Sequence, residues 1–148
     1  MELGIFWYKE SMNEKTTTKQ GLYEYYYEDE YSDQVKWRGH YQDGLKHGLV
    51  EAFHWKNGYL LRKEHWKEGK EEGVWEQFDQ ETGKLTNRAN FLKGKQTSAE
   101  WFFENGQVEI RGEFKNNAQD GLWEYFDKHG QLAYKGQFKK GKGEWSMA

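Results

Sequence analysis

The chain contains no cysteine and no proline, and it has few long apolar runs in its 148 residues. The missing cysteine excludes disulfides, thiolate metal sites and thiol catalysis, and it is unremarkable in a reducing cytosol. The N-terminal stretch has neither a basic start nor a long apolar run, so we expect no signal peptide, no transmembrane helix and a cytoplasmic location. A net charge of -3 gives no strong field toward nucleic acid or anionic lipid. We therefore expect no nucleic acid partner, and a membrane is disfavoured.

Aromatic residues and glycine are abundant in the chain, whereas aliphatic residues are few. Aromatics make up 18% of the chain and thus about half of its 35% hydrophobic content, together with 17 Gly. Rings pack through their large area, while tyrosine and tryptophan keep a polar atom for water. This composition favours β-sheets with partly wet faces over a deep aliphatic core. The length fits one domain, so we predict a single repeat domain over residues 1–148.

A repeat of 24 to 27 residues runs along the chain, with units that start at Gly21, Gly48, Gly73, Thr97 and Gly121. Each unit opens as G-x-(W/x)-E-x-(F/Y), passes through a turn and returns in an alternating run. Asn-Gly between alternating runs is a strong hairpin signal. The repeat predicts an all-β fold, an elongated antiparallel meander of about five repeated β-hairpins. We expect an N-terminal strand or cap over residues 1–20, five hairpins over 21–142 and a C-terminal capping strand over 143–148.

The pairing register follows from counting outward from the turns. Two-residue loops in the last two units, at Asn105-Gly106 and His129-Gly130, and three-residue loops in the second and third units place a glutamate opposite a cation each time. Such cross-strand pairs contribute about 0.2 to 1 kcal/mol each and chiefly fix register. The predicted pairs are Glu24 with Arg38, Glu51 with Lys63, Glu76 with Arg88, Glu100 with Arg111, and Glu124 with Lys135.

The opposite face of each predicted hairpin carries large rings across from small residues. Trp75 falls opposite Ala89 and Trp123 opposite Gly136, which would let the ring cover exposed backbone. Glu64 takes the place of the small residue in the second unit. We expect this face to be the concave or buried one. Further structural positions of the repeat on this face are Trp101 and Gly112.

The residues of the last unit, in "GEFKNNAQDGLWEYFDKHGQLAYKGQFKKGKGEW", resemble the bacterial variant of the MORN repeat, and the resemblance covers roughly Gly21 to Trp145. The matching positions are Gly121, Trp123, Phe126, Gly130, Leu132, Gly136, Phe138, Lys139 and Gly141, with Gly48, Phe53, Gly58, Leu60, Trp66, Lys67, Gly69, Lys70 and Gly73 in the second unit. Thr97 and Glu64 depart from it. The resemblance implies an interaction scaffold, similar to stand-alone bacterial arrays assigned as antitoxins or immunity proteins. It implies no common catalytic residues.

The first unit has the longest loop, within "LYEYYYEDEYSDQ" from Leu22 to Gln34. One hypothesis is an acidic, aromatic finger that docks a cationic surface, such as a nuclease-type toxin's substrate groove, by imitating phosphate charge. The alternative is a solvated hairpin tip. The aromatic face offers a second candidate, for protein hot spots, a glycan or unstacked bases, against a purely structural role. The candidate partner-binding residues are Tyr25, Tyr27, Glu28, Asp29, Glu30, Tyr31, Asp33 and Trp37.

We predict a non-enzymatic protein-binding repeat protein, in its specific form an antitoxin or immunity protein that binds and neutralises a cognate toxin. No catalytic residue, metal site or cofactor is expected. One alternative is a structural or scaffolding MORN-repeat protein, associated with membranes. A second is an enzyme such as a carbohydrate hydrolase, which the pairing of each glutamate with a cation disfavours. Open sheet edges would also admit a partner strand or a homodimer.

Overall fold

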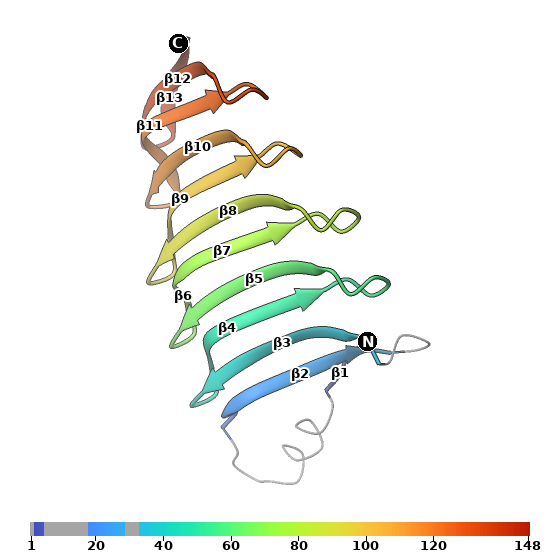
Figure 1. Cartoon of the computed structure of the whole chain (residues 1–148). Helices are drawn as coiled ribbons and strands as arrows, with labels where there is room; N and C mark the ends of the chain where they lie inside the picture. Colours follow the sequence, from blue (N-terminus) through green and yellow to red (C-terminus); the bar gives the residue numbers. More distant parts are fainter. Residues whose placement is uncertain (1, 5–17, 29–32) are drawn as a thin grey trace. The chain divides into compact units, whose positions relative to one another are not determined.

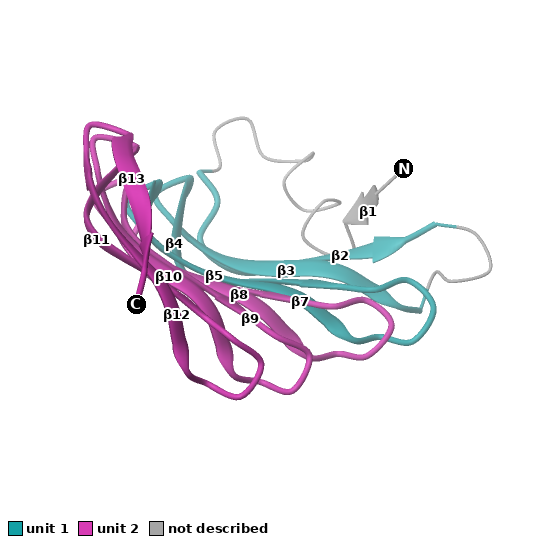
Figure 2. Ribbon diagram, turned by 90° about the horizontal axis from the view of Figure 1, so that it is seen from above, with its two compact units in different colours: residues 1–70 teal, residues 71–148 magenta. Residues whose placement is uncertain are grey.

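The structure is a computed structural model that describes residues 2–4, 18–28 and 33–148. Within these residues every regular element is a β-strand, and the predicted all-β antiparallel meander of hairpins is confirmed. The chain divides into two compact units, unit 1 over Met1–Lys70 and unit 2 over Glu71–Ala148 (Figure 2).

Unit 1 is an antiparallel sheet in which each strand pairs with the next one in the chain (Figure 1). Its strands are β1 (Glu2–Gly4), β2 (Gly21–Tyr27), β3 (Val35–Gln42), β4 (Leu45–Phe53) and β5 (Leu60–Lys67). Of the N-terminal strand or cap predicted over residues 1–20, the structure describes β1 and residues 18–20, and the rest lies outside the described residues. The two-residue strand β6 (Lys70–Glu71) lies where the chain passes out of unit 1.

Unit 2 is built in the same way, from consecutive antiparallel strands. They are β7 (Gly73–Phe78), β8 (Leu85–Leu92), β9 (Lys95–Phe102), β10 (Val108–Lys115), β11 (Ala118–Phe126), β12 (Leu132–Lys139) and β13 (Lys142–Met147). Hairpins therefore form from β7 and β8, from β9 and β10, and from β11 and β12. The last strand, β13, pairs with β12 and exposes all of its side chains.

The predicted register is confirmed in all five hairpins. The glutamate–cation pairs lie directly opposite each other on neighbouring strands, as do Trp75 with Ala89, Ala99 with Gly112, and Trp123 with Gly136. The five charged pairs are Glu24 with Arg38, Glu51 with Lys63, Glu76 with Arg88, Glu100 with Arg111, and Glu124 with Lys135. The strands therefore place glutamates and cations on one face, here called the charged face, and the ring–small pairs on the other, the ring face.

The charged face extends beyond the predicted hairpin pairs, because arginines also reach the glutamate of the following hairpin. Arg38 Nε lies 2.9 Å from Glu51 Oε1, and Arg111 Nε lies 2.8 Å from Glu124 Oε1. Arg88 contacts two carboxylates, Glu76 at 3.3 Å and Glu100 at 3.5 Å. These half-exposed pairs each contribute at most about 1 kcal/mol, and their main effect is to fix neighbouring hairpins in register.

The predicted two-residue loops within the hairpins are wrong, although the register that they gave is right. In the last hairpin β11 ends at Phe126 and β12 begins at Leu132, so the turn is longer than His129-Gly130. Asp127 explains the difference, because its Oδ1 atom accepts hydrogen bonds from the backbone N–H groups of His129 and Gln131, both at 2.9 Å. A register shift beside Tyr125 then absorbs the additional residue.

The tight two-residue turns lie instead between successive hairpins. At Asp43-Gly44 both residues have positive φ, of 51° and 78°, and Gln42 pairs directly with Leu45. Positive φ at both central residues defines the turn whose twist matches that of antiparallel strands. The same geometry recurs at Asn116-Asn117 and at Lys140-Gly141. The connections between hairpins are thus the shortest turns of the sheet.

The ring face of unit 2 packs around Trp123, which is only 3% exposed. We predicted that Gly136 makes room for this ring, and that prediction is wrong. Trp123 also lies opposite Gly112 on β10, and a Cβ atom at Gly112 would collide with the indole. At Gly136 the nearest side chain is Phe138. Trp123 Nε1 donates to the Glu113 carbonyl oxygen at 3.0 Å, which holds the indole over β10.

Candidate partner-binding pocket in unit 1

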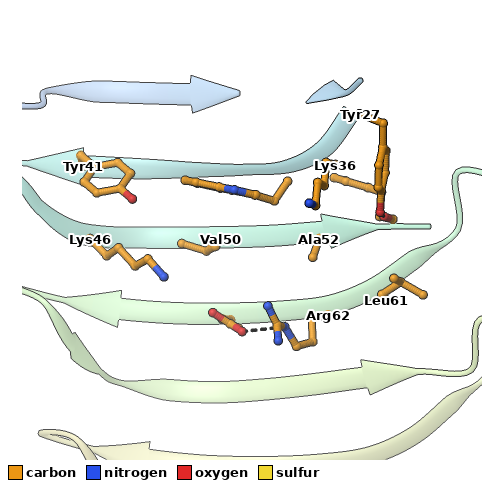
Figure 3. A pocket seen from close by; sticks show the side chains of 11 residues that line it. Tyr27, Lys36, Tyr41, Lys46, Val50, Ala52, Leu61 and Arg62 are labelled. Carbon is orange, nitrogen blue, oxygen red and sulfur yellow. Dashed lines mark hydrogen bonds and ion pairs between the residues drawn. The ribbon is translucent and has the colours of Figure 1, made fainter. Parts of the chain in front are cut away.

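The ring face of unit 1 differs from that of unit 2 at one register position. Val50 lies opposite Gly39 on β3 and Glu64 on β5, whereas Trp123 lies between two glycines in the same register. An isopropyl group covers much less of the sheet than an indole does. A cavity of about 460 Å³ lies over this part of the face, with Val50 and Glu64 in its lining (Figure 3).

The cavity has a largely apolar and aromatic lining that β2 to β5 supply. Tyr27 lies at one end, and its hydroxyl donates a hydrogen bond to the Phe53 carbonyl oxygen at 2.8 Å. Trp37 is stacked on Tyr25, with ring centroids 4.3 Å apart and planes 20° from parallel. The uncharged residues that line the cavity are Tyr27, Trp37, Tyr41, Val50, Ala52, Phe53 and Leu61.

Glu64 is the one buried charged residue in the described part of the chain, at 5% exposure. Both of its carboxylate oxygens are engaged. Oε1 lies 2.9 Å from Arg62 Nε, and Oε2 accepts a hydrogen bond from Trp66 Nε1 at 3.0 Å. A buried carboxylate needs such partners because water no longer solvates it. Glu64 is therefore held in the wall of the cavity by one partner on each carboxylate oxygen.

Cations outnumber anions among the described residues of the lining. They are Lys36, Lys46 and Arg62, with Glu64 as the single anion in that part of the chain. Lys46 Nζ lies 4.5 Å from the centroid of the Trp66 ring and Lys36 Nζ lies 5.4 Å from that of Tyr27, so both ammonium groups lie over aromatic faces. Figure 3 shows Tyr41, Lys46 and Arg62, from β3, β4 and β5, around the same space. Its net positive charge suits an anionic group next to an apolar one.

The structure divides the predicted partner-binding residues into two groups. Tyr27 and Trp37 line the cavity and Tyr25 stacks behind Trp37. Glu28 follows β2 and is half-buried, while Asp33 precedes β3 and is exposed. The remaining candidates, Asp29, Glu30 and Tyr31, lie outside the described residues. Of the described candidates, Tyr27 and Trp37 thus belong to the cavity, and Glu28 and Asp33 belong to the connection between β2 and β3.

Sequence reasoning missed the charged part of the cavity, namely Lys36, Lys46, Arg62 and Glu64. Two signals are present in the repeat. Val50 stands where two other units have tryptophan, and Glu64, noted above as a departure from the repeat, breaks the small-residue column. Val50 was not singled out from the sequence, and its position opposite Glu64 on the sheet is what joins the two residues in one site.

Among the described residues, no group of three or more His, Asp or Glu side chains is arranged to hold a metal ion. No helix in that part of the chain is long and apolar enough to cross a bilayer.

No known family model matches the chain, and no curated protein sequence matches it. Among solved structures, a mutant of S. aureus TarM in complex with Fondaparinux, alpha-GlcNAc-glycerol and UDP is similar over 65% of this chain and 19% of that one, at 13% identity and a TM-score of 0.47. A second crystal structure of TarM gives 66% and 19% coverage, 14% identity and a TM-score of 0.46. The chain thus spans about a fifth of the length of TarM.

Proposed function

We propose that this chain is a cytoplasmic, non-enzymatic, MORN-type repeat protein that binds another protein, and that the cavity of unit 1 receives a segment of that partner. The cavity itself carries the proposal. Its rings and its arginine are the side chains that dominate binding energy at protein interfaces. Its volume of about 460 Å³ lies within the range of roughly 300 to 1,000 Å³ typical of pockets that hold a ligand.

The chemistry of the occupant follows from the lining. Trp37 and Val50 offer an apolar floor, and Lys46 and Arg62 offer positive charge above it. Glu64 already satisfies part of the Arg62 charge, so an incoming carboxylate would meet chiefly Lys46. We infer a partner segment that presents an acidic side chain beside an apolar one.

In its more specific form, the proposal is that the partner is a toxin, which this chain neutralises. The support is the resemblance to stand-alone bacterial MORN-like arrays. The acidic loop around Glu28 and Asp33 adjoins Tyr27 in the sequence and would extend the contact to a cationic surface of the same partner. A non-enzymatic role is supported by the engaged oxygens of Glu64 and by the arginines that face the glutamates of the charged face.

The neighbouring genes supply the test of the toxin. Each neighbouring open reading frame is expressed in a bacterial host with and without this chain, growth is measured, and the purified pair is titrated by calorimetry. We expect one product to stop growth and to bind this chain. Co-expression of this chain should restore growth. If no neighbouring product is toxic or bound, the toxin form of the proposal is wrong and a scaffolding role is favoured.

The cavity is tested with matched variants once that partner is in hand. Lys46→Glu and Trp37→Ala alter the cavity, whereas Lys135→Glu and Trp101→Ala make the same changes in unit 2. We expect the first two to weaken binding by about tenfold or more and the second two to leave it nearly unchanged. Equal losses in both pairs would exclude the cavity as the contact.

The acidic loop has a separate test. Reversal of Asp29, Glu30 and Asp33 to lysine should weaken binding and reduce its dependence on salt, because charge attraction is screened by ions. Calorimetry at two salt concentrations provides both quantities. An unchanged affinity would remove the loop from the contact while leaving the cavity proposal in place.

A homodimer through an open sheet edge stays a prediction. β13 pairs with β12 along one side and carries Trp145 and Met147 among its exposed side chains. Exposed strand edges invite pairing with a second strand. Light scattering at micromolar concentration should then report a dimer, and a clean monomer would exclude it.

A further inference from the structure

Three tyrosine rings of unit 1 surround the side-chain ammonium group of Lys19. The Nζ atom lies 4.8 Å from the ring centroid of Tyr41, 5.2 Å from that of Tyr23 and 5.6 Å from that of Tyr25. It also donates a hydrogen bond to the Tyr25 hydroxyl at 3.0 Å. A cation within about 6 Å of an aromatic face is attracted by the electron density of the ring, and several such rings form an aromatic cage.

The three rings are positioned by the sheet and by one another. Tyr23 and Tyr25 are two residues apart on β2 and therefore point to the same face. Tyr23 is only 6% exposed and meets Tyr41 of β3 edge to face, with centroids 5.3 Å apart. Tyr25 is stacked on Trp37. Packing of this kind arranges the cage with little help from the cation, which lowers the entropic cost of binding one.

Lys19 belongs to a different part of the structure from the cage that it fills. It precedes β2, and its carbonyl oxygen accepts a hydrogen bond from the Gly44 N–H at 2.9 Å. Gln20 Nε2 donates to Asp43 Oδ1 at 2.7 Å in an exposed contact. These two bonds attach the segment to the β3–β4 turn. The cage and its occupant are therefore separable, since β2 and β3 build the rings and the preceding residues supply the lysine.

The number of rings distinguishes this site from the other cation–ring contacts of the described residues. Lys46 lies over Trp66, and Arg111 lies over Phe126, each as a contact with a single ring. The pKa of Lys19 is raised from its ordinary value. Burial alone would lower the pKa, but the hydrogen bond with Tyr25 and the interactions with the three tyrosines outweigh burial and raise it.

We propose that Tyr23, Tyr25 and Tyr41 form a binding site for an alkylammonium group, and that Lys19 occupies it as an internal ligand which an external ammonium group can replace. The external group would be the lysine side chain of a partner protein or its methylated form. The site does not depend on the toxin proposal or on the neighbouring cavity. Because the internal ligand competes at high effective concentration, the site should be weak in the native chain and stronger without Lys19.

The test uses the full chain and two simple salts. Lys19→Ala and the native protein are titrated with n-butylammonium chloride and with tetramethylammonium chloride, against sodium chloride at equal ionic strength, with tyrosine and tryptophan fluorescence as the readout. We expect Lys19→Ala to bind at least one of them about tenfold more tightly than the native chain. Stronger butylammonium binding would indicate a lysine as the natural occupant, and stronger tetramethylammonium binding a methylated one.

Two controls test whether the three tyrosine rings cause the increased affinity of Lys19→Ala for an ammonium group. Lys46→Ala removes a lysine from a single ring and should create no such affinity. Tyr41→Leu added to Lys19→Ala should return the affinity to the native level. If Lys19→Ala binds no better than Lys46→Ala, Lys19 is only a structural latch and the proposal is overturned.

One measurement is made on the native chain and so does not depend on whether the variants fold. Ring currents should shift the proton resonances of the Lys19 ε-methylene group upfield of those of the other lysines. An unshifted Lys19 resonance would overturn the proposal, whatever the variants do.

Discussion

Units 1 and 2 share one hairpin register and differ in what fills the ring face. In unit 2 the indole of Trp123 lies over Gly112 and is 3% exposed. In unit 1 the matching position holds Val50, opposite Gly39 and a buried Glu64, and a cavity lies there. At these two matching positions the larger side chain is buried over the sheet, and the smaller one borders a cavity.

The charged face shows no such difference. Arg38 pairs with Glu51 in unit 1 as Arg111 pairs with Glu124 in unit 2, at nearly equal distances of 2.9 and 2.8 Å. Register is thus maintained by one face of the sheet. The other face can change its side chains without loss of strand pairing.

The largest expected effect breaks the core of unit 2. Trp123→Ala removes a buried indole and should lower the free energy of unfolding by about 3 to 5 kcal/mol, as large-to-small changes in cores do. Val50→Ala at the matching position of unit 1 removes two methyl groups next to an existing cavity and should cost about 1 to 2 kcal/mol. Guanidinium denaturation followed by circular dichroism measures both, and equal losses would contradict the comparison.

A smaller effect concerns the glycines beneath these side chains. Gly112→Ala would drive a Cβ atom into the Trp123 indole and should cost about 1 to 3 kcal/mol through overpacking. At Gly39 the new atom would meet the Val50 Cγ2 atom at 2.9 Å, where the neighbouring cavity gives the valine room to move. We expect Gly39→Ala to cost less than Gly112→Ala in the same denaturation experiment. The reverse order would show that the ring face of unit 1 is as closely packed as that of unit 2.

A third change gives unit 1 the side chains that surround Trp123 in unit 2. Val50→Trp combined with Glu64→Gly places an indole between two glycines, as around Trp123. We expect the free energy of unfolding to change by less than about 1.5 kcal/mol, because the lost carboxylate and the added ring have opposing effects. Partner binding should be lost because the indole occupies the cavity. Retained binding, measured by calorimetry, would place the contact elsewhere.

The smallest expected effect is a pH dependence within unit 1. Burial, then the hydrogen bond and negative charge of Glu24, raise the pKa of Tyr26 to about 12. A phenol whose pKa is higher in the folded chain stabilises the fold below its unfolded pKa of about 10, and this contribution is lost as the pH rises toward 12. In an alkaline titration of tyrosinate absorbance, Tyr26→Phe should remove one late-ionising tyrosine. An unchanged late phase would contradict the assignment.

The strand register could be predicted from the sequence because the same glutamate–cation pair repeats in every unit. Each unit therefore predicts the same register independently. The turn lengths could not be predicted from the sequence, since the hydrogen bonds of Asp127 lengthen the turn. A register shift in the last hairpin absorbs the additional residue, so the strand pairing is the same as with a shorter turn. The position of the Trp123 ring could not be predicted from the sequence either. That residue has a glycine on each side, Gly112 and Gly136, and only side-chain packing selects between them.

The candidate site was predictable in its aromatic part and not in its charges. Tyr27 and Trp37 belong to an aromatic-rich unit that stands out in the sequence. Lys46 and Arg62 come from separate strands, and both line the cavity beside Val50. Lys19 precedes the first hairpin and follows no periodic pattern, so nothing in the sequence joins it to three tyrosines.

The arginines of the charged face affect which mutations the fold tolerates. Each of Arg38, Arg88 and Arg111 contacts the glutamate of the following hairpin, and each also lies opposite the glutamate of its own. The alignment of the strands is therefore encoded more than once. Mutations at ring-face positions such as Val50 should therefore leave the pairing of the strands intact.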